Sequence, residues 1–275
     1  MKHRSISPGF PTARPRFRRF RTWTFVALVA GCLIAAPAVA APVKVLHPEG
    51  PSRGFVALSD LQGNVLAHGE LTQWIERKEV VSRLVFNFED GSIYDEIVRF
   101  TQDPVFRQTS YQLIQKGPSF PQGSEVRFDR SGRYEARLET KEDGEERAKG
   151  EFDVPDDVTN GMTSILLKNL PRGGTATTNL VSFDPEPMVL DLHLTPEGTD
   201  SFWVGRQERT ATRFLVEPKV TGVTGMLATV VGKQPPPIRM WIAQGKAPGL
   251  VRFEGAFYVG GPVWRVEMEA PTWKR

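Results

Sequence analysis

Two short histidine–carboxylate pairs are the residues of this chain best suited to chemistry. His68 and Glu70 stand two positions apart, and so do Asp191 and His193. On a β-strand, residues i and i+2 share a face, so each pair presents one imidazole and one carboxylate together. If the two strands were neighbours, the four groups could hold a divalent metal or act as an acid and a base. The alternating leucines around the second pair favour the simpler interpretation, in which both pairs face solvent.

No other catalytic pattern is present in the sequence. The chain has no G-x-S-x-G elbow, no H-E-x-x-H, no P-loop and no G-x-G-x-x-G. Only His47, His68 and His193 lie beyond residue 40, and the single cysteine is Cys32. We therefore expect no catalytic residue, no cofactor and no resident metal. A metal-dependent enzyme that uses the two pairs is the weakest interpretation of the chain.

The first forty residues have the three parts of an export signal. Residues 1–24 contain seven basic side chains and no acid, and an apolar run, Phe25–Ala36, follows. The triplet Ala38-Val39-Ala40 is a small-residue cleavage site, so we expect residues 1–40 to be removed after Ala40. A true membrane span is the alternative, but twelve apolar residues fall short of the roughly twenty that a helix needs to cross. No membrane span is expected after cleavage.

Two other kinds of export signal can be compared with the same stretch, and the compartment can then be inferred. Val29-Ala30-Gly31-Cys32 resembles a lipobox, but the apolar run continues beyond Cys32, so cleavage is favoured over a lipid anchor. Arg18-Arg19 is a twin arginine without the apolar residues that should follow it. The mature chain would have no cysteine and no N-x-S/T sequon. An exported protein of this composition suits a bacterial periplasm.

The net charge also changes when the signal is removed. The chain has 35 basic and 32 acidic residues, for a net charge of +3. Removing the seven basic residues of the signal leaves 28 basic against 32 acidic, or −4. The basic character belongs to the discarded segment, so nucleic acid is not an expected partner.

The stretch DDVTNGMTSILLKNLP, residues 156–171, is the clearest helix pattern. Val158, Met162, Ile165 and Leu166 recur at i, i+4, i+7 and i+8, which predicts one apolar stripe on a helix over 156–170. An aspartate at its start can cap it, and a proline with two following glycines can end it. A helix of this length is marginal alone, so it must pack against neighbouring strands.

Most of the remaining chain alternates apolar and polar residues between turn residues, as β-strands do. The predicted strands are 54–59, 65–77, 80–88, 92–101, 105–115, 125–129, 134–141, 147–152, 175–183, 189–194, 200–207, 210–217, 238–243, 250–258 and 263–269. The segment Thr195–Gly198 is expected to turn the chain between two of them. Residues 41–53 are predicted to be a tether, and a weaker apolar stripe predicts a second helix over 222–232. Residues 54–275 then form one β-rich domain.

This order of elements resembles the half-barrel of periplasmic lipoprotein carriers of the LolA and LolB type. The resemblance covers most of residues 54–269 and is helped by DDVTNGMTSILLKNLP and GKQPPPIRMWI, residues 232–242. It implies a curved antiparallel sheet wrapped around one or two amphipathic helices, with an apolar cavity for acyl chains. No diagnostic motif of the family maps onto this chain, so no family site is carried over.

If the chain shares that shape, aromatic and methionine side chains on strand and helix faces are candidates for the ligand-binding wall. They are Phe86, Phe88, Met162, Ile165, Met226, Trp241, Phe253 and Trp264. Ordinary core packing is the alternative for every one of them. The expected function is binding or carrying a hydrophobic small molecule or lipid in the periplasm. A non-catalytic envelope interaction or assembly protein, with a protein partner, is the second interpretation.

Overall fold

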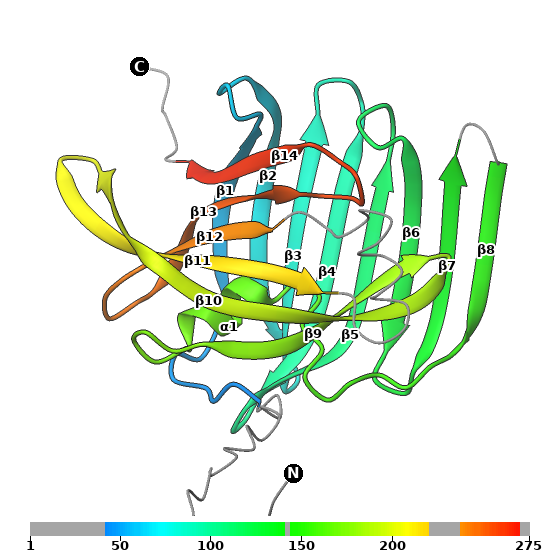
Figure 1. Cartoon of the computed structure of the whole chain (residues 1–275), viewed down its shortest axis with the longest axis horizontal. Coiled ribbons are helices and arrows are strands. Elements are labelled where there is room, and N and C mark those ends of the chain that lie inside the picture. The colour runs from blue at the N-terminus through cyan, green and yellow to red at the C-terminus, as the bar shows by residue number, and fades with distance from the viewer. Residues whose placement is uncertain (1–41, 141–143, 220–236, 270–275) are drawn as a thin grey trace, which may run out of the picture. The chain divides into compact units, whose positions relative to one another are not determined.

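Strands that follow one another in the chain pair with one another through most of the molecule. The computed structural model describes residues 42–140, 144–219 and 237–269, all within the unit Val39–Arg275. These residues form one antiparallel sheet of 14 strands and one short helix (Figure 1). The fold is therefore mainly β, as the alternating pattern of the sequence predicts.

The strand bounds agree closely with the predicted ranges. The strands are β1 (Ser52–Ser59), β2 (Val65–Glu76), β3 (Glu79–Phe88), β4 (Ile93–Gln102), β5 (Phe106–Lys116), β6 (Gln122–Asp129), β7 (Arg133–Thr140), β8 (Gly144–Glu151), β9 (Ala176–Asp184), β10 (Glu186–Val204), β11 (Gln207–Lys219), β12 (Ile238–Ala243), β13 (Gly249–Ala256) and β14 (Val263–Glu269). The helix α1 is Thr163–Lys168. Aspartate–glycine and related turns join most of the neighbours, and Gly91 has the positive φ, 83°, that such a turn needs.

One pairing between the ends of the described chain joins two meanders into a single sheet. The strand order is β8-β7-β6-β5-β4-β3-β2-β1-β14-β13-β12-β11-β10-β9. The link is β1 with β14, in which Leu58 lies opposite Val266. The sheet edges are thus β8 and β9, which are consecutive in the chain and are connected through α1.

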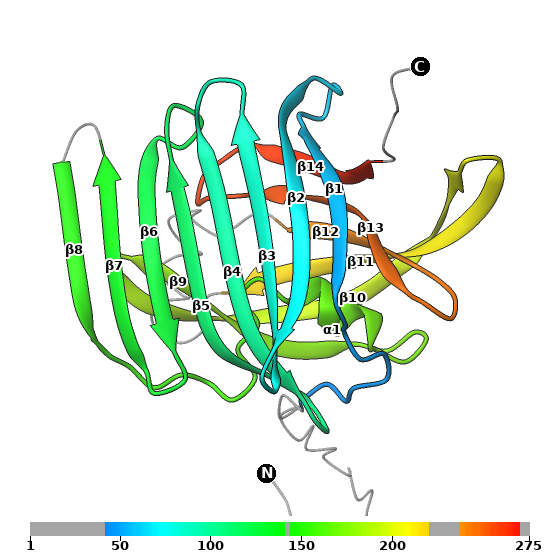
Figure 2. The same cartoon turned by 180° about the vertical axis from the view of Figure 1, so that it is seen from behind.

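The sheet bends so that its two halves form two layers. Strands β9–β14 cross in front of β1–β8 in Figure 1, and Figure 2 shows β1–β8 as the layer behind. Along each strand, every second side chain points into the space between the layers, so the apolar face of one half covers that of the other. Burial of these inner faces, rather than of a central helix, supplies the core.

Three groups of buried side chains fill that space. The first joins β3–β7 to the segment before α1 and to β9, and includes Phe100, Tyr111, Phe128, Met162 and Val181. The second, which we call the aromatic cluster, joins β3 and β4 to β14 and includes Phe86, Phe88, Tyr94, Phe120 and Trp264. The third joins α1 to β10–β12 and includes Leu167, Leu192, Phe214, Met240 and Ile242.

The helix is much shorter than the sequence predicts. All four stripe residues are buried as expected, at 3% exposure or less. However, α1 begins only at Thr163, and Asp156 and Asp157 do not cap it. Val158 instead forms a parallel bridge with Asn179, and Gly161 has a left-handed φ of 70°. The helical spacing was misleading because Val158 is buried by strand-like pairing, and asparagine and glycine are poor helix formers.

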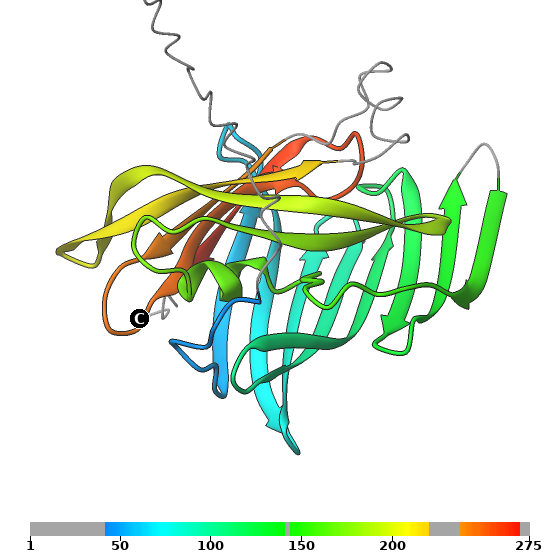
Figure 3. The same cartoon turned by 60° about the horizontal axis from the view of Figure 1, so that its bottom comes forward.

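The sheet therefore does not wrap around a long rod. In Figure 3, α1 lies on the inner side of the β9–β14 half, where its contacts are with β12 and β13. The second helix, expected over 222–232, lies outside the described residues. In the described part of the chain, no helix is long and apolar enough to cross a bilayer.

The turn predicted at Thr195–Gly198 is also wrong. Strand β10 runs through it without a break, and a register shift between Pro196 and Gly198 absorbs the irregular residues. Strand β9 pairs with β10 only as far as Leu194, so Pro196 stands on a free edge where no backbone N–H is needed. Proline and glycine mark a bulge here rather than a reversal of the chain.

The predicted tether, residues 41–53, overlaps the start of β1, and its described part before β1, residues 42–51, is bound to the body of the domain. Lys44 bridges Val105, and the backbone N–H groups of Leu46 and His47 both donate to Asn169 Oδ1 at 2.7 Å. The proline content that suggested a tether reflects an irregular but anchored segment.

Candidate functional site

A cavity between the two layers is the best candidate for a functional site. It has a volume of about 230 Å³ and lies between the inner faces of β5–β7 and the strands β9 and β10. Leu113, Val126 and Leu138 form one wall, and Leu180 and Leu190 contribute to the other. The wall forms because inner-facing residues of neighbouring strands are in register: Leu113 lies opposite Val126.

None of the described residues that line this cavity is charged. This is informative because 24% of the chain is Asp, Glu, Lys or Arg, and those residues occupy the outer faces of the same strands. On β7, for example, Arg137 points outward and pairs with Glu145 at 2.5 Å, while Leu138 points inward. The cavity therefore suits an uncharged, mainly apolar ligand.

Two of the amide side chains in the wall are engaged with backbone. Gln115 Nε2 donates to the carbonyl oxygen of Phe257 at 2.7 Å. The Asn160 side chain pairs with Val181 in both directions: it donates to the carbonyl oxygen at 2.8 Å and accepts from the N–H at 2.9 Å. These bonds fix the wall and satisfy its buried amides, so they leave the apolar side chains to determine which ligand is accepted.

Glu96 is a carboxyl group set behind that wall. It lies on the inner face of β4, where Leu84 and Leu113 are its cross-strand neighbours. Tyr111, which lines the cavity, donates its hydroxyl to Glu96 Oε1 at 2.8 Å. Glu96 lies deep inside the folded sheet and yet keeps an intermediate exposed fraction. A side chain that lies inside the fold but borders a cavity is expected to keep some exposed surface in this way.

Burial raises the pKa of the Glu96 carboxyl, while hydrogen bonds from Tyr111 and Tyr94 oppose the rise. Burial and the nearby carboxylate raise the pKa of both tyrosines well above their ordinary value. None of the ion pairs among the described residues involves Glu96. The surroundings of Glu96 therefore disfavour its ionised form relative to a carboxyl group in water.

The segment before α1 closes this part of the interior. Gly161 lies so close to Glu96 that a Cβ added to it would approach the carboxyl carbon to 3.1 Å. Any larger residue here would press on the buried acid and would also have to adopt the left-handed φ of 70°. Glycine is needed here for both reasons.

The residues predicted to form a ligand-binding wall are distributed over several groups. Phe86, Phe88 and Trp264 belong to the aromatic cluster, where Phe88 and Trp264 have ring centroids 5.6 Å apart. Met162 and Ile165 lie in the first cluster. The structure thus brings three of the predicted residues together, but none of these five lines the cavity.

The three other predicted residues have separate positions. Phe253 packs against both the aromatic cluster and the third cluster. Trp241 points to the outer face of the sheet, where its Nε1 donates to Asp200 at 2.7 Å and the Arg252 guanidinium lies over its ring. Met226 lies outside the described residues.

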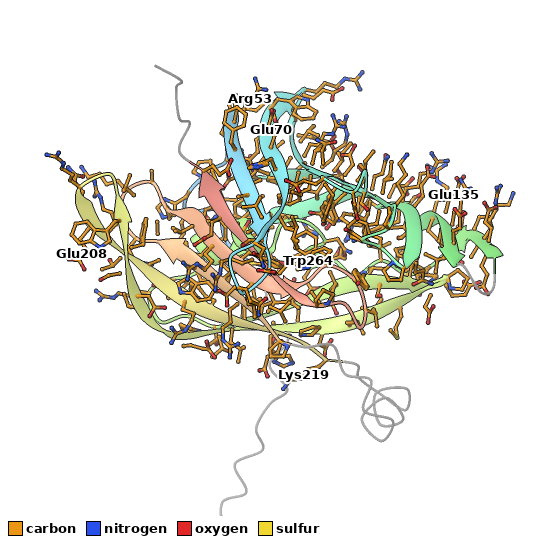
Figure 4. The ribbon with its side chains drawn as sticks, turned by 90° about the horizontal axis from the view of Figure 1, so that it is seen from above. Arg53, Glu70, Glu135, Glu208, Lys219 and Trp264 are labelled. Carbon is orange, nitrogen blue, oxygen red and sulfur yellow. The ribbon has the colours of Figure 1, made fainter. Side chains whose placement is uncertain are left out.

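The histidine–carboxylate pairs do not converge. Strands β2 and β10 are separated in the sheet by β1, β14, β13, β12 and β11, so the two strands are not neighbours. Glu70 forms an ion pair with Arg53 at 2.6 Å, and Figure 4 shows both side chains together at the edge of the view. No group of three histidine or carboxylate side chains within the described ranges could hold a metal ion. The arrangement required for the metal or acid–base hypothesis is absent from this part of the chain.

Sequence reasoning missed the residues that do line the cavity. Tyr111, Leu113 and Asn160 were not singled out. The period-two pattern of β5 correctly indicates that Tyr111, Leu113 and Gln115 share a face. What it does not indicate is which layer covers that face, because this depends on the pairing of distant strands.

The geometry is the only guide to function. Comparisons of the chain with protein-family models, with curated proteins and with solved structures find no match.

Proposed function

We propose that this chain is an exported protein that binds or carries an uncharged hydrophobic ligand, such as a lipid acyl chain, in the cavity between its two layers. The absence of charged side chains among the described residues of the wall is the observation that supports this proposal best. An acyl chain needs apolar contact along its length, and the leucine, valine and phenylalanine side chains of the wall provide it.

The curvature of the sheet adds support for a half-barrel carrier. One continuous antiparallel sheet encloses buried apolar side chains, and a short helix packs inside one half. This is the general arrangement that the resemblance to LolA-type carriers implies, although α1 is short and the inner faces pack mainly on each other. The export signal at residues 1–40 would place such a carrier in the periplasm.

A cavity-filling substitution tests the proposal. Leu180 on β9 lines the cavity and is only half-buried, so Leu180→Trp can extend into it without displacing the core. We expect the wild-type chain to bind the neutral dye N-phenyl-1-naphthylamine and the variant to bind it at least about tenfold more weakly. Excluding two methylene equivalents, at about 0.8 kcal/mol each, accounts for that factor.

Ile75→Trp is the matched control, because Ile75 is 51% exposed and lies on β2, away from the cavity. It should leave dye binding unchanged, and urea unfolding should show that both variants are folded. Equal dye affinity in the wild type and Leu180→Trp would reject the cavity as the site. Lipid extraction and mass spectrometry of protein purified from its own host would then identify the natural ligand.

A non-catalytic envelope interaction or assembly role is the second candidate. It is favoured by an exposed sheet edge: beyond Leu194, β10 pairs with no described strand on the side where β9 has ended. Unpaired strand edges of this kind are templates for pairing with another chain. Failure of the dye experiment, together with recovery of a stoichiometric protein partner, would favour this role.

A further inference from the structure

The end of the β10–β11 hairpin projects from the sheet as a two-stranded arm. We define the arm as residues Phe202–Arg209, which pair with one another across the hairpin. Strand β9 pairs with β10 only up to Leu194, and β12 pairs with β11 only from Ala211 onward. Within the described chain, the strands of the arm therefore pair only with each other. Figure 1 shows the arm reaching beyond the other strands, and Figure 4 shows Glu208 at its outer end.

The tip of the arm carries three successive apolar residues in contact with solvent. Trp203 is 66% exposed and Val204 is 59% exposed, while Phe202 is half-buried. Trp203 is the most exposed tryptophan among the described residues. An isolated ribbon gains little from packing, so apolar residues at its tip are not explained by the stability of the fold.

These side chains occupy both faces of the ribbon. Successive residues of a strand point in opposite directions, so Phe202 and Val204 lie on one face and Trp203 lies on the other. A protein partner that docks on a ribbon covers one of its faces. Apolar residues on both faces at a tip are better explained by a medium that surrounds the tip.

Cations without carboxylate partners accompany the apolar tip. Arg206 and Arg209 on the arm, and Lys246 across an open groove of about 1020 Å³, take part in no ion pair among the described residues. The carboxylates of the same groove are engaged: Asp200 with Arg213 at 2.6 Å and Glu267 with Arg252 at 2.6 Å.

The charges outside the arginine–carboxylate ion pairs are positive in balance at this end of the molecule. Glu269, the remaining carboxylate of the groove, lies 3.2 Å from His68. Glu269 and the exposed Glu208 at the tip stand against the three cations, which leaves one positive charge in excess. An anionic surface would therefore be attracted to this end of the molecule.

We propose that the arm is a membrane-contact element, which inserts Trp203 and its apolar neighbours into the interface of an anionic bilayer. Tryptophan prefers the level of the lipid headgroups, and arginine and lysine bind headgroup phosphates. Gly205 lies in the turn at the tip, and no atom lies within 4 Å of a Cβ added to it. This proposal does not depend on the cavity, and either one can fail alone.

A fluorescent label on the tip tests the proposal directly. The test protein is the chain as its host processes it, with Cys32→Ser and Val204→Cys, so that one cysteine carries an environment-sensitive naphthalene dye. Vesicles of phosphatidylethanolamine with phosphatidylglycerol should shift the emission of this label to the blue. Arg206→Glu with Arg209→Glu should weaken the vesicle affinity about fivefold for each cation lost.

A label at Ile75→Cys is the matched control. Ile75 is 51% exposed and apolar, and it lines neither the cavity nor the groove beside the arm, so it reports non-specific adsorption of the chain. It should show no shift with the same vesicles. Equal shifts at 204 and 75, or no shift at 204, would overturn the proposal. A blue shift of the label at 204 on raising the protein concentration alone, without vesicles, would identify a second copy of the chain as the occupant. That result would also overturn the proposal.

Discussion

The acid at position 96 illustrates how one inward-facing residue can affect the whole core. Glu96 occupies a position of β4 that alternation assigns to the interior, between Leu84 and Leu113 on the neighbouring strands. Its carboxyl group accepts a hydrogen bond from Tyr111 and lies against Gly161. Among the described residues, no cation forms an ion pair with it. An ionised carboxylate here would be buried without compensation, which is unfavourable.

Glu96→Gln should therefore change how stability depends on pH. The folded pKa lies above the ordinary value of 4.5, because burial favours the protonated form. Below that value both states are protonated and the acid has no effect. As pH rises above it, the unfolded state ionises first, so the free energy of unfolding falls until the folded pKa is passed. The fall is about 1.4 kcal/mol for each unit by which the pKa is raised.

Urea unfolding from acid to mildly alkaline pH measures this effect. The other carboxyl groups are common to both proteins, so the difference in the free energy of unfolding isolates Glu96. Over that window Glu96→Gln, which can still accept from Tyr111, should gain stability relative to the wild type as the pH rises. Glu151→Gln, on the exposed face of β8, is the control and should follow the wild-type profile. Parallel profiles for the wild type and Glu96→Gln would show that the carboxyl is solvated.

The segment around α1 is held in place by side-chain-to-backbone bonds rather than by helix length. Asn160 pairs with the backbone of Val181 on the β9 edge. Asn169, which is 2% exposed, accepts from the N–H groups of Leu46 and His47 and donates to the carbonyl oxygen of Ile165 at 2.8 Å. The segment thus covers a sheet edge and anchors residues 42–51 at the same time.

Asn169→Ala should destabilise the protein by about 1–3 kcal/mol, because it removes the acceptor of two partly buried backbone N–H groups and the donor to one buried carbonyl. The decrease in the urea midpoint, multiplied by the slope of the free energy with urea concentration, measures this loss of stability. Hydrogen exchange at Leu46 and His47 should accelerate, since their acceptor is lost. Asn64→Ala, in an exposed turn, is the control and should change stability by less than about 1 kcal/mol. Unchanged exchange at Leu46 and His47 would contradict this account.

The two layers depend on each other because one sheet forms both. The aromatic cluster lies where they meet, and Trp264 of β14 packs on Phe88 of β3 and on Phe257. The free edges are protected: β8 exposes mostly charged side chains, and Val158 bridges β9 at Asn179. Neither layer has a second apolar face that could stabilise it alone.

Trp264→Ala should therefore lower stability by about 3–5 kcal/mol while unfolding remains a single transition. Far-UV circular dichroism and tryptophan fluorescence should give coincident urea curves. Trp203→Ala is the control, because that side chain is 66% exposed and should change the free energy of unfolding by about 0.5 kcal/mol or less. Two separate transitions in the variant would mean that the layers fold independently.

Local pattern along the chain was sufficient to predict nearly every strand. The ranges 238–243 and 263–269 coincide with β12 and β14, and the alternation of Tyr134, Ala136 and Leu138 correctly marks the inner face of β7. These features depend on residues close together in sequence, since alternation and turn residues act within a few positions. The mainly β class and the burial of the apolar stripe over 158–166 follow from the same information.

Only the tertiary structure decided how those elements are used. The pairing of β1 with β14, the separation of β2 from β10 and the shortening of α1 all depend on contacts between distant residues. The cavity likewise exists because β9 and β10 are placed over β5–β7, so no property of its individual strands could predict it. Side-chain alternation specifies which face of a strand is buried, but the partner of that face is selected by the free energy of the complete fold.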